Sequence, residues 1–292
     1  MFRIRKRFHL LFVSLLVMGM LPFVIRLGGL STSVARVGSR GGIEPIYATF
    51  KSGSVKWYGH LGAVRGTSSW AKGTGRQVAL NRRSFRHVFA SSHGSLYAVT
   101  NRGALLWFRH TGWKRGVRSW ATGSGKSVGS GWGKFTKVFA TSRGVIYGLQ
   151  SNGALRWYRH RGYLNGATSW AVGSGRVVGT GWNTYRKLMA TSKGVIYGIS
   201  SSGSLVWSRH YGHLRGTKSW SRTSVVGRRW QHFSKVFAGS NGVLYVVDNK
   251  GHLRWYRHSG WLVGTKAWAG GAGNRVGTGW RTPQLIFSGI QP

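Results

Sequence analysis

The residues that catalysis or metal binding would need are scarce in this chain. Its 292 residues include only two acids, Glu44 and Asp248, and no cysteine. Glycoside hydrolysis normally uses a pair of carboxylates, and Asp248 stands in a turn-like Asp-Asn-Lys-Gly sequence. No nucleophile elbow, phosphate-binding loop or zinc-protease motif occurs in the sequence. We therefore expect a protein that is not an enzyme and that uses no cofactor.

Histidines recur at regular positions and raise the question of a metal site. One occurs in each of five similar segments: His60, His110, His160, His210 and His258. Zinc and calcium sites need several convergent imidazoles, thiolates or carboxylates. A single histidine per segment keeps these side chains apart unless they face a common axis, so we expect no metal site.

Tryptophan and glycine, in contrast, recur in a pattern that suits sugar binding. A Gly-x-Gly-Trp turn offers an aromatic face for the C–H surface of a sugar and backbone donors for its polar groups. Three copies are complete, a fourth is shortened around Trp230, and the first has Arg82 in place of the tryptophan. The complete copies are Gly129, Gly131 and Trp132; Gly179, Gly181 and Trp182; and Gly277, Gly279 and Trp280.

A second set of tryptophans is expected to line the same clefts from a neighbouring strand. The set comprises Trp70, Trp120, Trp170, Trp220 and Trp268, and its candidate binding members are the last four. The alternative interpretation is structural: each tryptophan of the turns packs between adjacent repeats, and glycine is needed only to turn the backbone. The two interpretations are compatible.

The elements that position these residues follow from a repeat of about 50 residues. Anchor tryptophans occur at Trp57, Trp107, Trp157, Trp207 and Trp255, each with a histidine three residues later and a tyrosine ten residues earlier. Each repeat contains short runs of β-branched and aromatic residues separated by Gly, Ser or Asn, which read as strands and turns. The sequence predicts an all-β, five-bladed β-propeller of four-stranded antiparallel blades. We expect the anchors to pack inside the blades, with arginine–tryptophan stacking as a secondary role.

The two ends of the repeat array predict how the ring closes. The first copy begins near Ile46–Tyr47 and lacks the Val-Phe-Ala type strand that opens the others. The C-terminal Leu285–Ser288 matches that strand. We expect it to complete the first blade and leave no free sheet edge in the ring.

The segment Trp170–Ile199, WAVGSGRVVGTGWNTYRKLMATSKGVIYGI, resembles the repeat of the tachylectin family of lectins over residues of about 46–288. The resemblance implies a five-bladed propeller that binds N-acetylated hexosamines between blades, with the last strand closing the first blade. The Asp-Asn pair that precedes the recurring tryptophan in that family is absent. The pairs found here are Ser68–Ser69, Arg118–Ser119, Thr168–Ser169, Lys218–Ser219 and Lys266–Ala267.

The charge is extreme, because 44 Lys and Arg face only two acids and give a formal net charge of +42. Such a chain repels itself unless anions surround it. Acidic glycans, other anionic polymers, a membrane surface and nucleic acid are therefore candidate partners, through a salt-sensitive attraction. A solvated surface adapted to an unusual environment is the other interpretation.

The N-terminus reads as an export signal. Arg3, Arg5, Lys6 and Arg7 precede an apolar run from about Phe8 to Ile25, followed by small residues near Ala35. We assign residues 1–35 to a signal peptide or an N-terminal membrane anchor, because the run is also long enough to span a bilayer. Residues 36–292 form the propeller, and we expect it to be secreted or at the cell surface.

The sequence thus predicts a lectin-like propeller whose repeated clefts bind carbohydrate, either an N-acetylhexosamine or an acidic glycan. Multiple weak sites on one ring would act together through avidity. The alternative functions are salt-sensitive binding of polyanions and a scaffold for protein partners, both without sugar specificity.

Overall fold

The computed structural model of the protein describes residues 42–80 and 85–292. They lie within a single compact unit, residues 40–292. The expected export signal lies outside the described residues. In the described part of the chain, no helix is long and apolar enough to cross a membrane.

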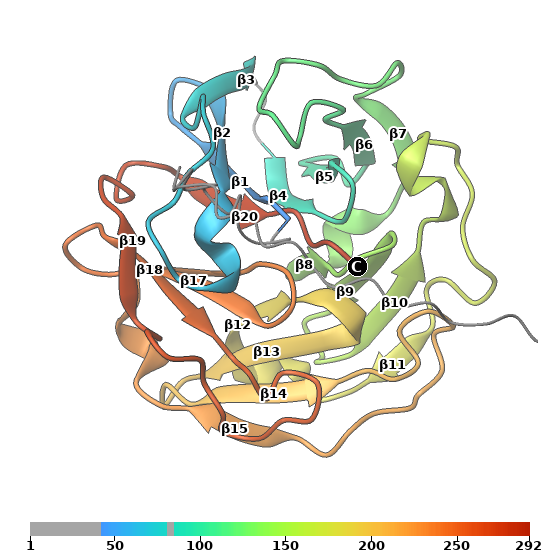
Figure 1. Ribbon diagram of the computed structural model, residues 1–292. Helices are drawn as coiled ribbons and strands as arrows, with labels where there is room; N and C mark the ends of the chain where they lie inside the picture. The colour runs from blue at the N-terminus through green and yellow to red at the C-terminus, as the bar shows by residue number, and fades with distance from the viewer. Residues whose placement is uncertain (1–41, 81–84) are drawn as a thin grey trace, which may run out of the picture. The chain divides into compact units, whose positions relative to one another are not determined.

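Five four-stranded antiparallel sheets form a ring, which confirms the predicted five-bladed propeller (Figure 1). Blade I contains β20 (Leu285–Ser288), β1 (Glu44–Thr49), β2 (Ser54–His60) and β3 (Arg76–Leu80). Blade II contains β4 (Phe85–Ala90), β5 (Ser95–Thr100), β6 (Leu105–Arg109) and β7 (Lys126–Gly129). Blade III contains β8 (Lys137–Ala140), β9 (Val145–Leu149), β10 (Leu155–Arg159) and β11 (Val177–Gly179).

Blade IV contains β12 (Tyr185–Ala190), β13 (Val195–Ser200), β14 (Leu205–Arg209) and β15 (Ser224–Gly227). Blade V contains β16 (Lys235–Ala238), β17 (Val243–Val247), β18 (Leu253–Arg257) and β19 (Asn274–Gly277). The helices in the described residues are short 3₁₀ turns: Leu61–Val64, Trp132–Lys134, Arg161–Leu164, Trp182–Thr184, Ser192–Gly194 and Trp230–His232.

The C-terminal strand closes the ring as predicted. β20 pairs antiparallel with β1, with Tyr47 opposite Phe287, and Figure 1 shows the red C-terminal strand beside the blue β1. The rings of Tyr47 and Phe287 stack with centroids 5.6 Å apart. The same stack joins Phe89 to Tyr97 in blade II, so strand β20 performs in blade I the role of an inner strand.

The core of each blade follows from the repeat. The anchor tryptophans and the tyrosines ten residues before them are almost completely buried, and each tyrosine is paired directly with its tryptophan across two strands, as Tyr47 is with Trp57. Large aromatics at these positions supply much of the apolar area that a small sheet needs to pack against its neighbours. The inner strands, which carry the Val-Phe-Ala sequences, line a central cavity of about 170 Å³.

Candidate functional site

Adjacent blades are joined by hydrogen bonds from the anchor tryptophans. Trp57 in blade I donates its Nε1–H to the carbonyl of Trp113 in blade II at 2.8 Å, and Trp255 in blade V donates to Ala63 in blade I at 2.8 Å. The other three anchors make the equivalent bond: Trp107 to Tyr163, Trp157 to His213 and Trp207 to Trp261. The anchors are therefore structural, as the sequence analysis expected.

Each anchor indole also lies flat against a glycine of the next blade. A Cβ added to Gly66, which has a φ of +71°, would lie 2.2 Å from Cε3 of Trp255. The expectation that arginines stack on these tryptophans is wrong, because the arginines bond to backbone carbonyls of the next blade instead. Arg159, for example, donates from Nη1 to the carbonyl of Leu214 in the next blade at 3.0 Å, and the cation above an anchor ring is Lys126, 5.9 Å from the centre of Trp107.

The five repeated histidines form a second link between blades. The Nδ1 atom of each histidine accepts a hydrogen bond from a tyrosine of the preceding blade. Its Nε2 atom lies within hydrogen-bonding distance of a backbone carbonyl. Tyr47 Oη lies 2.9 Å from His110 Nδ1, and His110 Nε2 lies 2.8 Å from the carbonyl of Val117. Because a carbonyl only accepts, Nε2 carries the proton and Nδ1 accepts from the tyrosine hydroxyl. These imidazoles are neutral and fully committed to the protein.

The described residues contain no group of three or more His, Asp or Glu side chains that could hold a metal ion.

The two acids, Asp248 and Glu44, stabilise different parts of the structure. Asp248 caps its turn by accepting from the backbone N–H of Lys250 at 3.0 Å, the role expected from the sequence, and it pairs with Arg254 at 2.8 Å. Glu44 is buried beside Ser288 and Ser240, where blade V meets blade I.

The second set of tryptophans lies in the clefts between blades, as predicted. Each donates its Nε1–H to the outermost strand of the preceding blade, and each is only half-buried. The bonds run from Trp120 to Val78, Trp170 to Val128, Trp220 to Val178 and Trp268 to Val226, with Trp70 to Val276 as the fifth. One edge of every indole is therefore used for structure, while part of its surface reaches solvent.

The tryptophans of the Gly-x-Gly-Trp turns meet this second set in pairs. Trp132 lies 6.0 Å from Trp170, Trp182 lies 5.1 Å from Trp220, and Trp230 lies 5.9 Å from Trp268, measured between ring centroids. Trp280 lies 6.0 Å from Trp70, a residue that the candidate set omitted. Trp120 has no turn tryptophan as a partner. The repeat position that would supply one holds Arg82, which lies outside the described residues.

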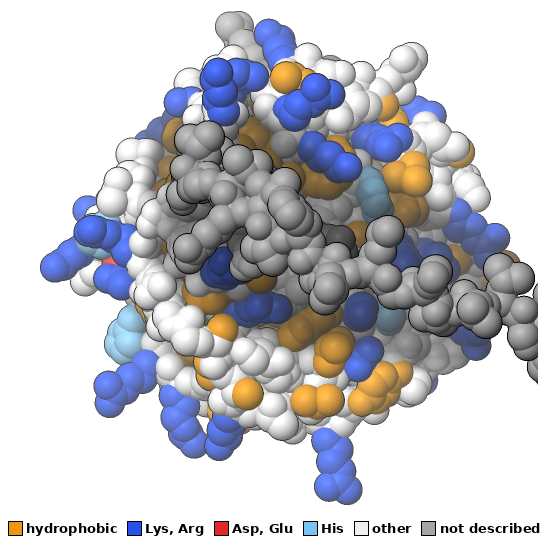
Figure 2. Space-filling model, in the orientation of Figure 1, with side chains coloured by type: hydrophobic (Ala, Val, Ile, Leu, Met, Phe, Trp, Pro, Cys, Tyr) orange, Lys and Arg blue, Asp and Glu red, His pale blue; other side chains and the backbone are white. Residues whose placement is uncertain are grey.

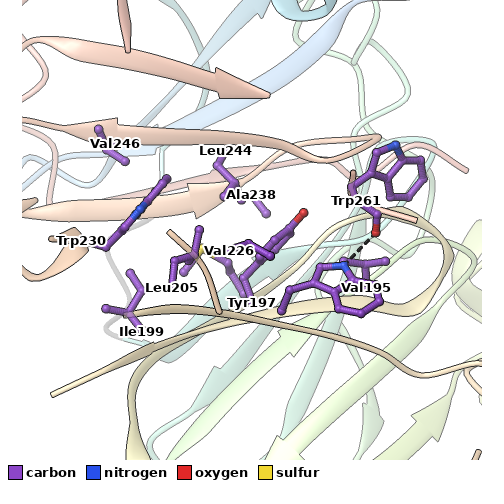
Figure 3. Packing of buried hydrophobic residues seen from close by; sticks show 12 residues of the cluster. Val195, Tyr197, Ile199, Leu205, Val226, Trp230, Ala238, Leu244, Val246 and Trp261 are labelled. Carbon is purple, nitrogen blue, oxygen red and sulfur yellow. Dashed lines mark hydrogen bonds between the residues drawn. The ribbon is translucent and has the colours of Figure 1, made fainter. Parts of the chain in front are cut away.

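Three of these turn tryptophans are buried between blades, as the structural interpretation expected. Trp132, Trp230 and Trp280 are 3%, 5% and 5% exposed. Each packs against a tyrosine of the next blade, as Trp132 does against Tyr158 at 4.6 Å. Figure 3 shows Trp230 between Leu205 of blade IV and Val246 of blade V. Their faces are occupied by protein and are not available for stacking on a sugar.

Trp182 differs because the cleft between blades III and IV lacks that tyrosine. The position that holds Tyr158 in blade III holds Ser208 in blade IV. Trp182 is consequently half-buried, and it faces the half-buried Trp220 at a tilt of 44°. Among the four clefts in which a described turn tryptophan meets the second set, this is the one in which both indoles are half-buried.

The indole N–H groups of the turn tryptophans remain available. The Nε1 atoms of four turn tryptophans have no protein acceptor among the described residues: Trp132, Trp182, Trp230 and Trp280. None of these atoms is among the buried side-chain polar atoms that lack a partner in the described residues, which are His93 Nδ1, Arg209 Nε and Gln291 Nε2. The four indole N–H groups are therefore open to solvent. Each lies close to the first glycine of its turn, since a Cβ on Gly179 would lie 2.5 Å from Trp182 Nε1.

The second glycine of each turn is needed for its conformation rather than for space. Gly131, Gly181 and Gly279 have φ values of +71°, +75° and +77°, and a Cβ on any of them would meet no atom within 4 Å. Arg229 adopts the same conformation in the shortened copy, with a φ of +65°. The fourth turn therefore keeps this backbone conformation of the complete ones, although its sequence is shortened.

The sequence did not predict the tyrosine–histidine links between blades. The signal was present, because tyrosine and histidine recur in fixed register in all five copies. The sequence does not show that the tyrosine of one blade meets the histidine of the next.

Comparison with known proteins agrees with this architecture. No curated protein sequence matches the chain. A symmetrical protein from work on its de novo evolutionary emergence superposes with a TM-score of 0.53, at 22% identity over 85% of this chain and all of the other. Two further neighbours superpose less well. An Aleuria aurantia lectin mutant in complex with α-methyl-L-fucoside has a TM-score of 0.43 and 18% identity, over 83% of this chain and 77% of the other. A mutant of AofleA from Arthrobotrys oligospora has a TM-score of 0.44 and 12% identity, over 85% of this chain and 72% of the other.

A family model supplies the stronger evidence, since the symmetrical protein, at 22% identity, establishes only a shared fold. The model described as Tachylectin matches residues 48–285, which is most of the chain and all five blades. With its five blades, its closing C-terminal strand and its repeated glycine–tryptophan turns, this chain belongs to the tachylectin family.

Proposed function

We propose that this protein is a non-catalytic, carbohydrate-binding propeller. The observation that carries the proposal is a chemical unit repeated between blades: a glycine turn, a solvent-accessible indole N–H and a half-buried second indole. Apolar surface and a few convergent donors are what a sugar site requires. Membership of the tachylectin family and the absence of an accessible carboxylate pair in the described residues support the same function.

The cleft between blades III and IV is the strongest of these sites. Trp182 and Trp220 offer two partly accessible indoles, and Trp182 Nε1 has no protein acceptor among the described residues. The exposed Lys218 precedes Trp220 by two residues and adds a positive charge near the cleft. An N-acetylated hexosamine or an acidic sugar would pair its C–H face with the indoles and its polar groups with these donors.

Glycan-array binding at low salt, followed by isothermal titration of the best saccharides, tests this function. We expect binding to N-acetylhexosamines or acidic glycans, with stronger retention on multivalent surfaces because several clefts act together. A folded protein that bound no saccharide, neutral or acidic, would refute the proposal.

A second candidate function, salt-sensitive binding of anionic polymers, is favoured by the unpaired positive charge. Among the described residues, Asp248 is the one acid that forms an ion pair with an arginine or lysine, Arg254. Figure 2 shows Lys and Arg side chains spread around the face in view, with little acidic surface between them. Exposed cations without partners attract phosphate, carboxylate and sulfate polymers over a distance set by ionic strength.

The salt dependence of binding separates the two functions. A polyanion-binding protein without sugar specificity should hold polymers of equal charge density equally well and release all of them at high salt. A lectin should discriminate between saccharides of equal charge, and it should retain part of its affinity for neutral sugars. Export to the cell surface is a further part of the proposal, and detection of the native protein outside the cell membrane tests it.

A further inference from the structure

The cleft between blades I and II contains an apolar cavity of about 380 Å³. Blade I contributes Val55, Val78 and Ala79 to its walls, and blade II contributes Phe108 and Trp120. This is the cleft in which the repeat lacks the tryptophan of the Gly-x-Gly-Trp turn. The repeat position that holds an indole in the other clefts carries Arg82 here.

The neighbours of that missing indole are nevertheless present. In the next cleft, Trp132 lies 5.4 Å from Phe135, 4.6 Å from Tyr158 and 6.0 Å from Trp170. The repeat places Phe85, Phe108 and Trp120 at these three positions, and all three line the cavity. The walls of an indole-binding box are therefore retained where the chain supplies no indole.

The small side chain of Ala79 points into the same space. Ala79 occupies the repeat position of Gly129, where an added Cβ would lie 2.9 Å from Trp132 Nε1. Substituting a larger residue for Ala79 would accordingly fill the cavity from the strand that forms its wall.

Polar groups that described residues bring to the cavity are few and mostly satisfied. Trp120 donates to the carbonyl of Val78 at 3.0 Å, and Ser124 donates to that of Ala121 at 2.7 Å. A sugar placed here would bury hydroxyl groups without hydrogen-bond partners, which is unfavourable. Among the described lining residues, the charged one is Arg118, which is exposed and has no ion-pair partner there.

We propose that this cavity binds a planar aromatic molecule of about the size of indole that carries a carboxylate. The aromatic walls would enclose the ring, and the carboxylate would face Arg118. An apolar cavity of about 150 Å³ already binds benzene, and the cavity's volume lies within the usual range of small-molecule sites. Trp120 is also a sequence-predicted sugar-binding residue, but its cleft lacks the Gly-x-Gly-Trp turn of the proposed sugar sites, so this proposal does not depend on them.

Isothermal titration of the full-length protein with indole-3-acetate tests the proposal. We expect one site per chain, with weaker binding of neutral indole and no competition from N-acetylglucosamine. Octanoate is the matched aliphatic acid. Octanoate bound as tightly as indole-3-acetate would overturn the aromatic assignment, and no detectable binding of indole-3-acetate would overturn the site.

Two variants locate the binding. Ala79→Phe should weaken indole-3-acetate binding by about tenfold or more, because the ring space is filled. Arg118→Gln should weaken binding of indole-3-acetate by about two- to fivefold, typical of an exposed ion pair, and leave neutral indole unchanged. Lys218→Gln, at the same repeat position beside the III/IV cleft, is the control and should change neither. Unchanged binding in a folded Ala79→Phe protein would refute the location.

A spectroscopic readout keeps the test independent of how these variants fold. In the ¹H–¹⁵N spectrum of the wild-type protein, indole-3-acetate should shift the indole N–H resonance of Trp120, assigned with Trp120→Phe. The resonance of Trp170, whose cleft holds Trp132, should not move. The reverse pattern would place the ligand elsewhere and overturn the proposal.

Discussion

Tyr245 and His60 are 185 residues apart in sequence, and the hydroxyl of Tyr245 donates to His60 Nδ1 at 2.7 Å. This bond joins blade V to blade I. The same bond joins every other pair of neighbours: Tyr47 to His110, Tyr97 to His160, Tyr147 to His210 and Tyr197 to His258. The ring is therefore held at each interface, including the closing one, by a neutral imidazole between a hydroxyl donor and a carbonyl acceptor.

Acid should weaken this ring through the histidines. Burial lowers the pKa of His60 to about 4, although its hydrogen bond to the carbonyl of Thr67 opposes the shift. The stability that the neutral imidazole contributes is thus complete above its ordinary pKa of 6.5 and is lost as the pH falls towards 4. For His60 alone the loss approaches about 3 kcal/mol.

Urea unfolding of the wild type and of His60→Gln at pH 7 and pH 4 measures this contribution. The variant should be less stable at pH 7, because Tyr245 loses its acceptor. The difference in unfolding free energy should shrink as the pH falls, since glutamine does not titrate. A difference that stays constant between pH 7 and pH 4 would show that the pKa of His60 is the same in the folded and the unfolded protein.

Glu44 lies at the same interface between blades V and I, and its contribution to stability should depend on pH in the opposite direction. Burial raises its pKa to about 7, against the lowering effect of hydrogen bonds from Ser288 and Ser240. Its folded-state pKa lies above the unfolded value, so its contribution is complete below about 4.5 and is lost as the pH rises through 7. Relative to the wild type, Glu44→Gln should gain about 3 kcal/mol in unfolding free energy between pH 4.5 and pH 8.5.

Asp248→Asn is the matched control for this measurement. Burial opposes ionisation of Asp248, but hydrogen bonds from the His252 backbone, Arg254 and the His252 side chain outweigh it and lower its pKa to about 2. The effect of removing this carboxylate should therefore be the same at pH 4.5 and pH 8.5. A pH-independent effect of Glu44→Gln would contradict the raised pKa of Glu44.

The closing strand should be as important as an internal one. Phe287 is 9% exposed and stacks on Tyr47, and Phe89 is 6% exposed and stacks on Tyr97 at 5.4 Å. Phe287→Ala should destabilise the protein by about 3–5 kcal/mol, close to the effect of Phe89→Ala. Thermal and urea unfolding compare them. A much smaller effect at Phe287 would mean that the ring is stable without its C-terminal strand.

Sugar affinity should depend on Trp182 more than on exposed aromatics outside the clefts. Trp182→Ala removes a half-buried indole and its free N–H, so we expect affinity at that cleft to fall by about tenfold or more. Tyr211→Ala removes a 53% exposed ring that makes no ring contact with Trp182 or Trp220, and should leave affinity unchanged. Titration with a monovalent saccharide, which avoids avidity, measures both. Equal affinity in all three folded proteins would exclude the III/IV cleft as the site.

The sequence identified the aromatic residues between blades but could not rank them. Trp132 and Trp182 occur in nearly identical turns, yet only Trp182 is half-exposed. The cause lies in the next blade, where Ser208 replaces the tyrosine that covers Trp132. The sequence of the turn itself does not predict this difference in exposure.

The sequence by itself determined the five-bladed ring, its closure by Leu285–Ser288 and the turns that carry the tryptophans. These features follow from periodicity, since a unit repeated five times must bury the same face each time. Only the tertiary structure decided which indoles are accessible, which histidines are buried and where a missing tryptophan leaves a cavity. Those properties depend on contacts between residues about 50 positions apart, and the chain brings them together only when adjacent blades pack.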